Sequence, residues 1–280
     1  MLYRELTDEE KEVIVHGGTE PPFVGVYCNV FETGVYRCRR CLLPLYLSEH
    51  KFPCPCGWPA FDDEVPGAVR RVSDADGKRT EIRCARCDGH LGHVFEKERL
   101  TMKNIRHCVN SLSLSFIPRS VLCRALLAGG CFWGVQHLLK DLDGVLETSC
   151  GYCGGIVDFP TYEQVCSGQT GHLETVEVWF HPEEISYEAL IRAFFEIHDP
   201  TQKGRQGPDI GQQYESAVFV MDEEQRRIVE ELLKALKNLG LQPVTQVREP
   251  SRFWMAEPLH QHYYTRTGGA PYCHRRVSRF

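Results

Sequence analysis

Two pairs of closely spaced cysteines constrain the first part of the chain more than any other feature of the sequence. Cys38 and Cys41 form one Cys-x-x-Cys pair, and Cys84 and Cys87 form a second pair much further along. Each pair can place two thiolates on one tetrahedral ion, so the intervening fold must bring the chain back to its starting point. Two disulfides or one redox-active pair are the alternatives. The spacing favours one structural Zn²⁺ in the N-terminal domain, with no open coordination position and no catalytic role.

The rest of the composition narrows the class of protein. Fourteen cysteines in 280 residues are too few for a disulfide scaffold and more than packing requires. The net charge is −6 and basic runs are absent, which argues against nucleic-acid binding. The chain starts with acidic and polar residues and has no long apolar run, so we expect neither a signal peptide nor a membrane span. We therefore predict a cytoplasmic protein, unless a leader has been removed, whose cysteines bind metal or catalyse reactions.

The chain changes its pattern near residue 120, which predicts two adjoining domains, 1–118 and 122–280. The first contains short β-like runs separated by turn residues, typical of an all-β fold. In the second, strand-like and helix-like runs alternate, which predicts an α/β or α+β fold. The join is very short, so loosely tethered domains are not expected.

Three helices of the second domain are predicted from their ends. One begins at Cys131, directly after two glycines. Ser186 is a good N-cap for a second helix, which ends at 199–200 because Asp-Pro follows its apolar stripe. Asp222 caps a third helix, and Gly240 stands at its C′ position.

One cysteine of the first domain stands among polar residues that suggest a site. Along one extended strand, Cys108 and Asn110 share a face that turns apolar over 112–116, so one end of the strand opens into a site. His90 and His93 would oppose each other on a regular strand, but the glycines beside them permit a bend that turns both inward. A buried cysteine with two surface histidines is the alternative.

The motifs across residues 1–118 resemble the B-type methionine sulfoxide reductases. They are the two cysteine pairs, KFPCPCGWPAF at 51–61, GHLGHVF at 89–95 and RHCVNSLSL at 106–114. The resemblance implies that Cys108 is the nucleophile and Cys56 the resolving thiol, and that Trp58 packs on the substrate methyl group. It further implies that the site is lined by His90, His93 and Asn110.

Two departures from the B-type pattern concern this site. Cys54 adds a thiol two residues before Cys56, with Pro55 between them. Side chains two apart in an extended segment point the same way, so geometry alone does not decide which thiol resolves Cys108. The resemblance favours Cys56. His107 stands where the family commonly has an aromatic residue, so the local polarity can differ.

A second reactive cysteine is predicted in Gly-Gly-Cys-Phe-Trp-Gly at 129–134, where a strand turns into a helix. A thiol at that position faces unpaired backbone N–H groups and the positive end of the helix dipole. Both favour the thiolate over the thiol, so we expect Cys131 to have a lowered pKa. A tight turn with packed aromatic residues is the alternative.

This string, with the motifs at 160–178, 197–217 and 268–274, resembles the A-type methionine sulfoxide reductases across about 122–280. The resemblance implies a two-layer α+β sandwich with a ferredoxin-like core. It implies that Cys131 is the nucleophile, Cys273 the resolving thiol and Glu174 the acid, which must then be largely protonated in an apolar pocket. The substrate-binding residues that it implies are Phe132, Trp133, Tyr162, Asp209 and Tyr214. Cys150 and Cys153 are left as unassigned thiols, and Cys123 and Cys166 are expected to be packed or spare.

Both resemblances imply one reaction class, in which a thiolate attacks sulfoxide sulfur and the cysteine remains as sulfenic acid. A second thiol then forms a disulfide, and thioredoxin or a similar dithiol restores the enzyme. One enzyme serves each sulfoxide epimer, so the fused chain is expected to repair both in oxidised proteins and peptides.

Two other classes of protein share some of these features. A thiol peroxidase or redox sensor would need no methyl-binding aromatic residues, so Trp58 and the Phe132-Trp133 pair argue against it. A zinc-bearing interaction module without activity in the first half is opposed by the complete set around Cys108.

Overall fold

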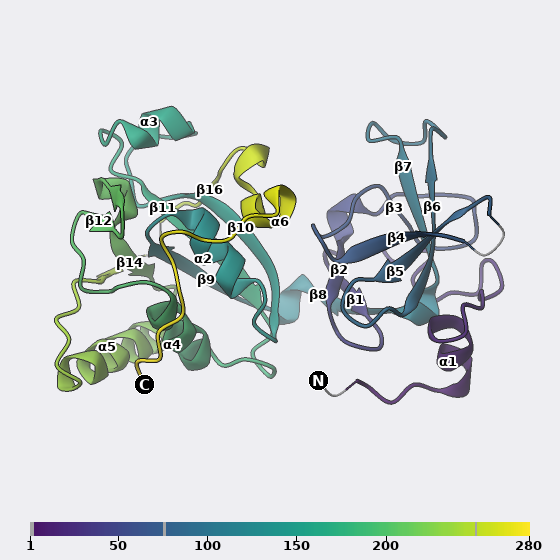
Figure 1. The fold of residues 1–280 in the computed structure, drawn as a ribbon, viewed down its shortest axis with the longest axis horizontal. Helices are drawn as coiled ribbons and strands as arrows, with labels where there is room; N and C mark the ends of the chain where they lie inside the picture. The colour runs from purple at the N-terminus through teal and green to yellow at the C-terminus, as the bar shows by residue number, and fades with distance from the viewer. Residues whose placement is uncertain (1–2, 75–76, 250) are drawn as a thin grey trace. The chain divides into compact units, whose positions relative to one another are not determined.

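The computed structural model describes residues 3–74, 77–249 and 251–280. The chain divides into two compact units, Met1–Val121 and Leu122–Phe280, hereafter the N-terminal and C-terminal units (Figure 1). No helix within the described residues is both long enough and apolar enough to cross a membrane.

The N-terminal unit consists mostly of strands arranged in two sheets. Within the described residues, one sheet has the order β2-β1-β8 and the other the order β3-β7-β6-β5-β4. The hydrophobic core of the unit includes Tyr36, Tyr46, Phe61, Ile82 and Leu91. The strands are β1 (Gly34–Cys38), β2 (Pro44–Leu47), β3 (Ala60–Phe61), β4 (Val69–Ser73), β5 (Thr80–Cys84), β6 (His90–Glu96), β7 (Ile105–Val109) and β8 (Leu114–Pro118). Single helical turns are η1 (Ser48–His50), η2 (Ser111–Ser113) and η3 (Arg119–Val121).

The prediction of an all-β N-terminal domain was wrong in one element, the helix α1 (Asp8–Ile14). Thr7 caps it by accepting a hydrogen bond from the backbone N–H of Glu10, and the Glu10 side chain accepts one from the N–H of Thr7. This reciprocal capping box is readable in the sequence as Thr-x-x-Glu before two buried apolar residues, Val13 and Ile14.

The prediction of one continuous strand through Cys108 and residues 112–116 was also wrong. β7 ends at Val109, η2 follows, and β8 starts at Leu114. The break has a tertiary cause, because the buried carboxylate of Glu20 accepts the backbone N–H groups of Ser111 (2.5 Å) and Leu112 (3.2 Å). Residues whose N–H groups are bound in this way cannot continue a ladder.

The C-terminal unit packs helices against one mixed sheet, as the α/β prediction requires. Within the described residues the strand order is β15-β14-β9-β11-β10-β16, antiparallel except for the parallel pair β14–β15. The succession β9-α2-β10-β11-α4-β14, with spatial order β14-β9-β11-β10, is the connectivity of a ferredoxin-like core. The strands are β9 (Cys123–Gly129), β10 (Val145–Cys153), β11 (Leu173–Phe180), β14 (Ser216–Phe219), β15 (Gln246–Arg248) and β16 (Trp254–Met255), with the small hairpin β12 (Arg205–Gln206) and β13 (Asp209–Ile210).

The three helices predicted from their ends are confirmed in α2 (Phe132–Leu139), α4 (Tyr187–Ile197) and α5 (Glu223–Asn238). Their N-caps are Cys131, Ser186 and Asp222, and the hydroxyl and carboxylate of the last two accept backbone N–H groups at 3.1 and 2.8 Å. Gly240 follows α5 with φ +85°. The remaining helical pieces are α3 (Tyr162–Cys166), η4 (Gln212–Tyr214), η5 (Pro258–His260) and α6 (Tyr263–Thr267).

Candidate functional site

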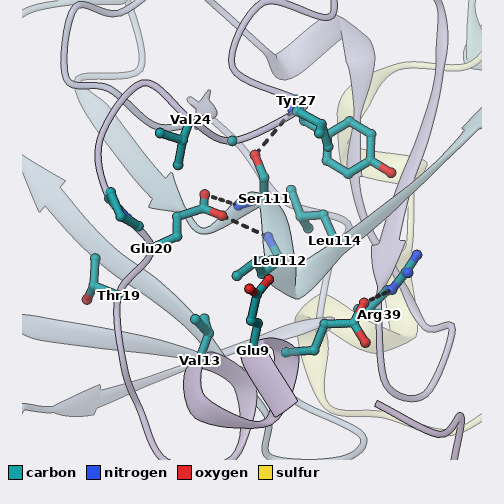
Figure 2. A pocket seen from close by; sticks show the side chains of 14 residues that line it. Glu9, Val13, Thr19, Glu20, Val24, Tyr27, Arg39, Ser111, Leu112 and Leu114 are labelled. Atoms are coloured by element: carbon teal, nitrogen blue, oxygen red, sulfur yellow. Dashed lines mark hydrogen bonds and ion pairs between the residues drawn. The ribbon is translucent and has the colours of Figure 1, made fainter. Parts of the chain in front are cut away.

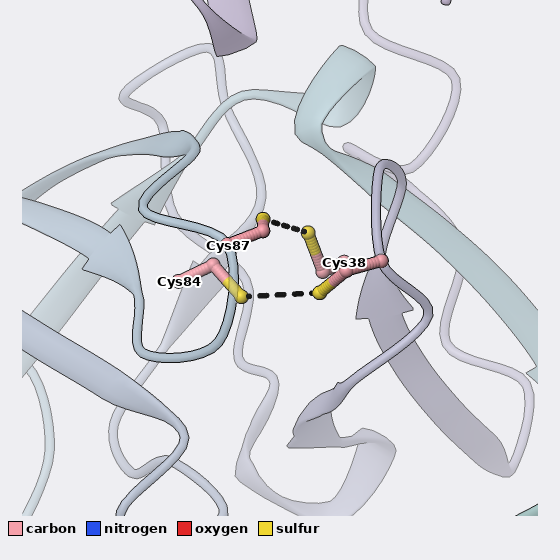
Figure 3. Close-up of side chains that lie close together, drawn as sticks. Cys38, Cys84 and Cys87 are labelled. Carbon is pink, nitrogen blue, oxygen red and sulfur yellow. Dashed lines mark hydrogen bonds between the residues drawn. The ribbon is translucent and has the colours of Figure 1, made fainter. Parts of the chain in front are cut away.

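The four predicted metal ligands meet in the N-terminal unit. Cys38 ends β1 and Cys84 ends β5, and the turns after these strands supply Cys41 and Cys87. All four thiols are buried, and their sulfur atoms lie within 4.8 Å of one another (Figure 3). The Cys38–Cys87 and Cys41–Cys84 sulfur separations are 3.6 and 3.5 Å.

These separations test whether the group fits a zinc ion. A tetrahedron with Zn–S bonds of about 2.3 Å has edges of roughly 3.8 Å, close to the spacing of the thiols. Four thiols are also the donor set that closed structural zinc sites use. Because β1 and β5 belong to different sheets, an ion held here would tie the two sheets together.

A thiol pair lies at the predicted site of the N-terminal unit. Cys108 on β7 and Cys56 in the loop before β3 have sulfur atoms 4.0 Å apart. The hydrogen bond from Cys108 lowers the pKa of Cys56 to about 5, and the backbone of Trp58 contributes to this shift. The same interaction, with burial, raises the pKa of Cys108, while Arg106 opposes the rise. The pair therefore holds one thiolate and one proton at neutral pH.

The two histidines of GHLGHVF turn to the same side, as the glycine-permitted bend predicted. Gly92 has φ +152°, and the pairing of β5 with β6 shifts register at Ile82/Arg83. The rings of His90 and His93 lie 5.6 Å apart. Both line a polar cavity of about 520 Å³, and His93 is the cross-strand partner of Cys108.

Each of these histidines is oriented by a carboxylate. His90 Nδ1 lies 2.6 Å from Glu81, and His93 Nε2 lies 2.7 Å from Asp74. Burial lowers the pKa of His90, so its ring is neutral near pH 7. His107, the departure from the family pattern, is fully buried and contacts Tyr46 on the face of β7 opposite to Cys108.

Glu20 organises this site and was missed by the sequence analysis. Its backbone N–H donates to Asn110 Oδ1 at 3.1 Å, and its carbonyl accepts Trp58 Nε1–H at 3.0 Å. Its carboxylate holds the start of η2 on one wall of a cavity of about 600 Å³ (Figure 2). Asn110 Nδ2 also donates to the carbonyl of Leu91, so this amide links β6, β7 and the N-terminal segment. Only the string Thr-Glu-Pro-Pro could have drawn attention to Glu20.

A further thiol of the N-terminal unit was also missed. Cys28 Sγ donates to the carbonyl of Gly57 at 3.3 Å, next to the resolving candidate Cys56. Burial raises the pKa of Cys28. Cys54 is half-buried and interacts with Cys56, so both rivals for the resolving role lie in the same loop.

The C-terminal unit brings its predicted thiols together with a carboxylate. Cys131 Sγ, Cys273 Sγ and an Asp209 oxygen lie within 4.8 Å of one another. Interaction with Cys273 and burial raise the pKa of Cys131, and the backbone N–H of Trp133 opposes them only in part. The expected lowered pKa at the helix N-terminus is therefore wrong for this structure, because the Cys273 thiol, burial and Asp209 outweigh the helix end.

Glu174 on β11 lies next to this cluster and is completely buried. Its Oε2 accepts the N–H of Phe132 at 3.0 Å. Burial raises its pKa well above the ordinary value, and Cys131 and Asp209 raise it further, which favours the protonated state that the resemblance requires. Burial and then Glu174 raise the pKa values of Tyr162 and Tyr214.

The aromatic part of the site includes residues that the sequence analysis did not single out. Trp133 stacks on Tyr263 with ring centroids 3.8 Å apart and donates Nε1–H to His260 at 3.2 Å. Phe132 is buried, with its ring 5.3 Å from that of His260. Tyr272 donates its hydroxyl to Asp209 at 2.8 Å.

The four thiols left over in the C-terminal unit do not join the cluster. Cys150 is fully buried and donates to Gln136 Oε1 at 3.2 Å, and buried Cys153 donates to the carbonyl of Ser251 at 3.6 Å. Cys123 and Cys166 are exposed rather than packed, and Cys166 interacts with Tyr162.

Two thiol pairs, each beside aromatic rings and proton-holding groups, define a cysteine-dependent oxidoreductase. Residues 123–280 match the family described as peptide methionine sulfoxide reductase, and residues 6–118 match the SelR domain. The chain belongs to the peptide methionine sulfoxide reductases, with a B-type half followed by an A-type half. This confirms the resemblance seen in the sequence.

Individual relatives agree with the family. The peptide methionine sulfoxide reductase MsrA of Nocardia farcinica is 49% identical over 154 residues, which are 54% of this chain and 88% of the relative. That of Thermus thermophilus is 48% identical over 150 residues, 53% of this chain and 85% of the relative. The solved structure of reduced Mxr1 from Saccharomyces cerevisiae is 32% identical with a TM-score of 0.52, covering 57% of this chain and 94% of Mxr1.

Proposed function

We propose that this enzyme reduces both epimers of methionine sulfoxide, in oxidised proteins and as the free amino acid. Residues 1–118 reduce the R epimer and residues 122–280 the S epimer. The single observation that carries the proposal is the repeated pairing of a nucleophile candidate with a second thiol, Cys108 with Cys56 at 4.0 Å and Cys131 with Cys273 within 4.8 Å. Two unrelated folds would have little reason to share this arrangement unless both perform the same reaction.

In the C-terminal unit, Cys131 attacks the sulfoxide sulfur, and its thiol proton replaces the one that Glu174 gives to the sulfoxide oxygen. Glu174 protonates the sulfoxide oxygen, with Tyr162 and Tyr214 as further hydroxyl donors to it. The oxygen is transferred to the cysteine sulfur and methionine leaves, so one thiol and one sulfoxide become one sulfenic acid and one thioether. Phe132 and Trp133 pack on the substrate methyl group. Asp209 binds the substrate close to its reacting sulfur.

In the N-terminal unit, Cys108 plays the same part with different neighbours. Arg106 stabilises the charge shared by Cys108 and Cys56. Trp58 packs on the methyl group. His90 and His93 face the sulfoxide oxygen. Asn110 holds the segment around Glu20 against β6 beside the site.

The second thiol of each pair completes the cycle. Cys56 or Cys273 condenses with the sulfenic acid, forming a disulfide and releasing water. Thioredoxin or a similar dithiol then reduces the disulfide by thiol exchange. In the N-terminal unit a structural Zn²⁺ on Cys38, Cys41, Cys84 and Cys87 would supply folding free energy and take no part in the chemistry.

Turnover of separate R and S methionine sulfoxide peptides by the intact chain tests the proposal. Cys131→Ser should abolish reduction of the S epimer and leave that of the R epimer within about twofold, and Cys108→Ser should do the reverse, each loss being at least about a thousandfold. Loss of both activities in either variant would disprove independent sites. Rapid peroxide reduction without sulfoxide reduction would favour a thiol peroxidase.

A further inference from the structure

The last described segment of the chain inserts a histidine beneath residues 129–134, hereafter the nucleophile loop. His274 is 5% exposed and lies against the glycines that surround Cys131. A Cβ atom added to Gly134 would overlap His274 Nδ1, and one added to Gly130 would lie 3.3 Å from its Cε1. The imidazole therefore fills space that the Gly-Gly-Cys-Phe-Trp-Gly string leaves free.

The two nitrogens of this ring have different partners, and these partners fix the tautomer. Nε2 lies 2.8 Å from the carbonyl oxygen of Gly129, which can only accept a hydrogen bond, so Nε2 carries the proton. Burial lowers the pKa of His274, so the ring is neutral near pH 7. Nδ1 then presents a lone pair, and the sulfur of Cys273 lies 2.9 Å from it. The Cys273 thiol must be the donor in this contact.

We propose that His274 is the general base that takes the proton of Cys273 when the resolving disulfide forms. This role rests on the proposed function, because Cys273 reacts only after Cys131 has been oxidised. The S–H proton moves to Nδ1, and the Cys273 thiolate attacks Cys131 Sγ. The S–S bond forms as the S–O bond of the sulfenic acid breaks. The proton from His274 balances the departing hydroxide, so the products are one disulfide, one water and a neutral imidazole.

The N-terminal unit has a different solution for its resolving thiol. Cys56 interacts with Cys108 and with the Trp58 carbonyl, and its pKa is already lowered to about 5. In the reduced pair this pKa is held down by Cys108 and by the Trp58 backbone, which are both groups of the N-terminal unit. Reduction of the R epimer is therefore an internal control for any change at His274.

The pH dependence of the resolving step follows from the groups around the ring. Asp209 raises the pKa of His274 in opposition to burial, His198 lies close enough for the two rings to influence each other, and Cys273 and Cys131 complete the surroundings. Below the pKa of His274 the imidazolium has no lone pair for the thiol. The rate of disulfide formation should therefore fall on the acid side and level off near neutrality.

Two substitutions in the full chain separate proton transfer from packing. In His274→Gln the amide nitrogen can reach the Gly129 carbonyl, as Nε2 does, but no basic nitrogen faces Cys273. His274→Asn places an amide near Cys273 and gives up the Gly129 contact. Arg275→Gln, at the adjacent exposed residue, is the matched control.

The experiment follows single turnover of the S epimer without reductant, trapping Cys131 sulfenic acid with dimedone and mapping the Cys131–Cys273 disulfide by mass spectrometry. We expect the first methionine to form within about twofold of the normal rate in both His274 variants. Disulfide formation should slow by about a hundredfold or more, as for loss of a general base. In the variants its rate should rise steadily with pH toward the ordinary thiol pKa of about 8.5. Arg275→Gln should behave normally.

Normal disulfide formation in His274→Gln would overturn the proposal, because that variant keeps the packing and lacks the base. If both variants fail to fold, the pH profile of the unmodified chain decides, and a profile that follows only a thiol pKa near about 8.5 would equally overturn it. Sulfenic acid generated with hydrogen peroxide provides a second route to the same step. If the chain did not reduce sulfoxide but still formed the disulfide after peroxide treatment in a way that depends on His274, the proposed function would be disproved and this inference would stand.

Discussion

The two thiol pairs of this enzyme occupy opposite electrostatic surroundings. Cys56 and Cys108 are partly exposed and share the positive field of Arg106, which favours the thiolate form of both against the effect of burial. Cys131 is buried near Glu174 and Asp209, and its pKa is raised by Cys273, by burial and by Asp209. In each pair the two sulfur atoms lie close together.

This difference indicates two ways to activate the same reaction. In the N-terminal pair the pKa of Cys108 is raised too, and the thiolate is on Cys56, whose sulfur lies 4.0 Å from that of Cys108 and can take its proton. In the C-terminal unit the raised pKa values favour the protonated forms of Cys131 and of Glu174, so in the proposed mechanism activation depends on protonation of the sulfoxide oxygen. In the proposed mechanism, a neighbouring thiolate that takes the proton of the nucleophile in one unit and a buried acid in the other thus serve the same step.

Removal of the metal should separate the two units most completely. We expect about one zinc per chain, and its chelation should remove R-epimer reduction altogether and leave S-epimer reduction unchanged, because Cys38 and Cys84 end strands of different sheets. Hydrogen exchange should show loss of protection in β1 and β5 only after chelation. A metal-free chain that stays protected and active in both reactions would contradict a structural ion.

Glu174→Gln should lower S-epimer turnover by about 10²- to 10⁴-fold, because an amide cannot supply the proton. The change should also raise the thermal stability of the C-terminal unit at neutral pH. Since the folded-state pKa of Glu174 is raised, its stabilising contribution is complete below the unfolded pKa and is lost as pH rises toward the folded pKa. The difference in thermal stability between Glu174→Gln and the unmodified chain should therefore widen as the pH rises from about 5 to about 8.

Glu177→Gln on the same strand is the matched control. Glu177 pairs with Arg124 outside the site, so its substitution should leave S-epimer turnover within about twofold. Equal losses in the two variants would remove Glu174 from the role of acid.

Substitution of the two rival thiols sharpens the assignment in the N-terminal unit. Cys56→Ser should still give about one equivalent of methionine from the R epimer, while thioredoxin-driven recycling falls by about tenfold or more. Cys54→Ser should recycle almost normally, because Cys56 is the thiol 4.0 Å from Cys108. Peptide mapping after one equivalent of substrate checks this, and a dominant Cys54–Cys108 disulfide in the unmodified chain would reverse the assignment.

Glu20→Gln should have the smallest effect, and only in the N-terminal unit. The amide can accept one of the two backbone N–H groups that the carboxylate holds, so the free energy of local opening around Ser111 should fall by about 1–3 kcal/mol. Hydrogen exchange at Ser111 and Leu112, with KM and kcat for the R epimer, measures this. Exposed Glu9→Gln should change the opening free energy by less than about 0.5 kcal/mol, and an equal effect there would mean that Glu20 has no special position.

Local patterns in the sequence were sufficient for much of the fold. The caps at Ser186 and Asp222 act within one helical turn, and both helices start where they were predicted. The capping box at Thr7 is equally local, so the helix that the sequence analysis missed was predictable from the same kind of signal. The break after Val109 was not predictable in this way, because the carboxylate that causes it belongs to Glu20, 91 residues before Ser111.

The sequence by itself determined the two cysteine pairs, the nucleophile loop and the alternation of strands and helices, because these depend on spacing and on short-range backbone preferences. Only the tertiary structure decided that Cys56 lies beside Cys108, that Tyr263 stacks on Trp133, and that His274 meets Cys273 beside Gly129. It also decided the charge state of Cys131. A pKa depends on burial and on charges brought from distant parts of the chain, and neither can be read from a residue's immediate neighbours.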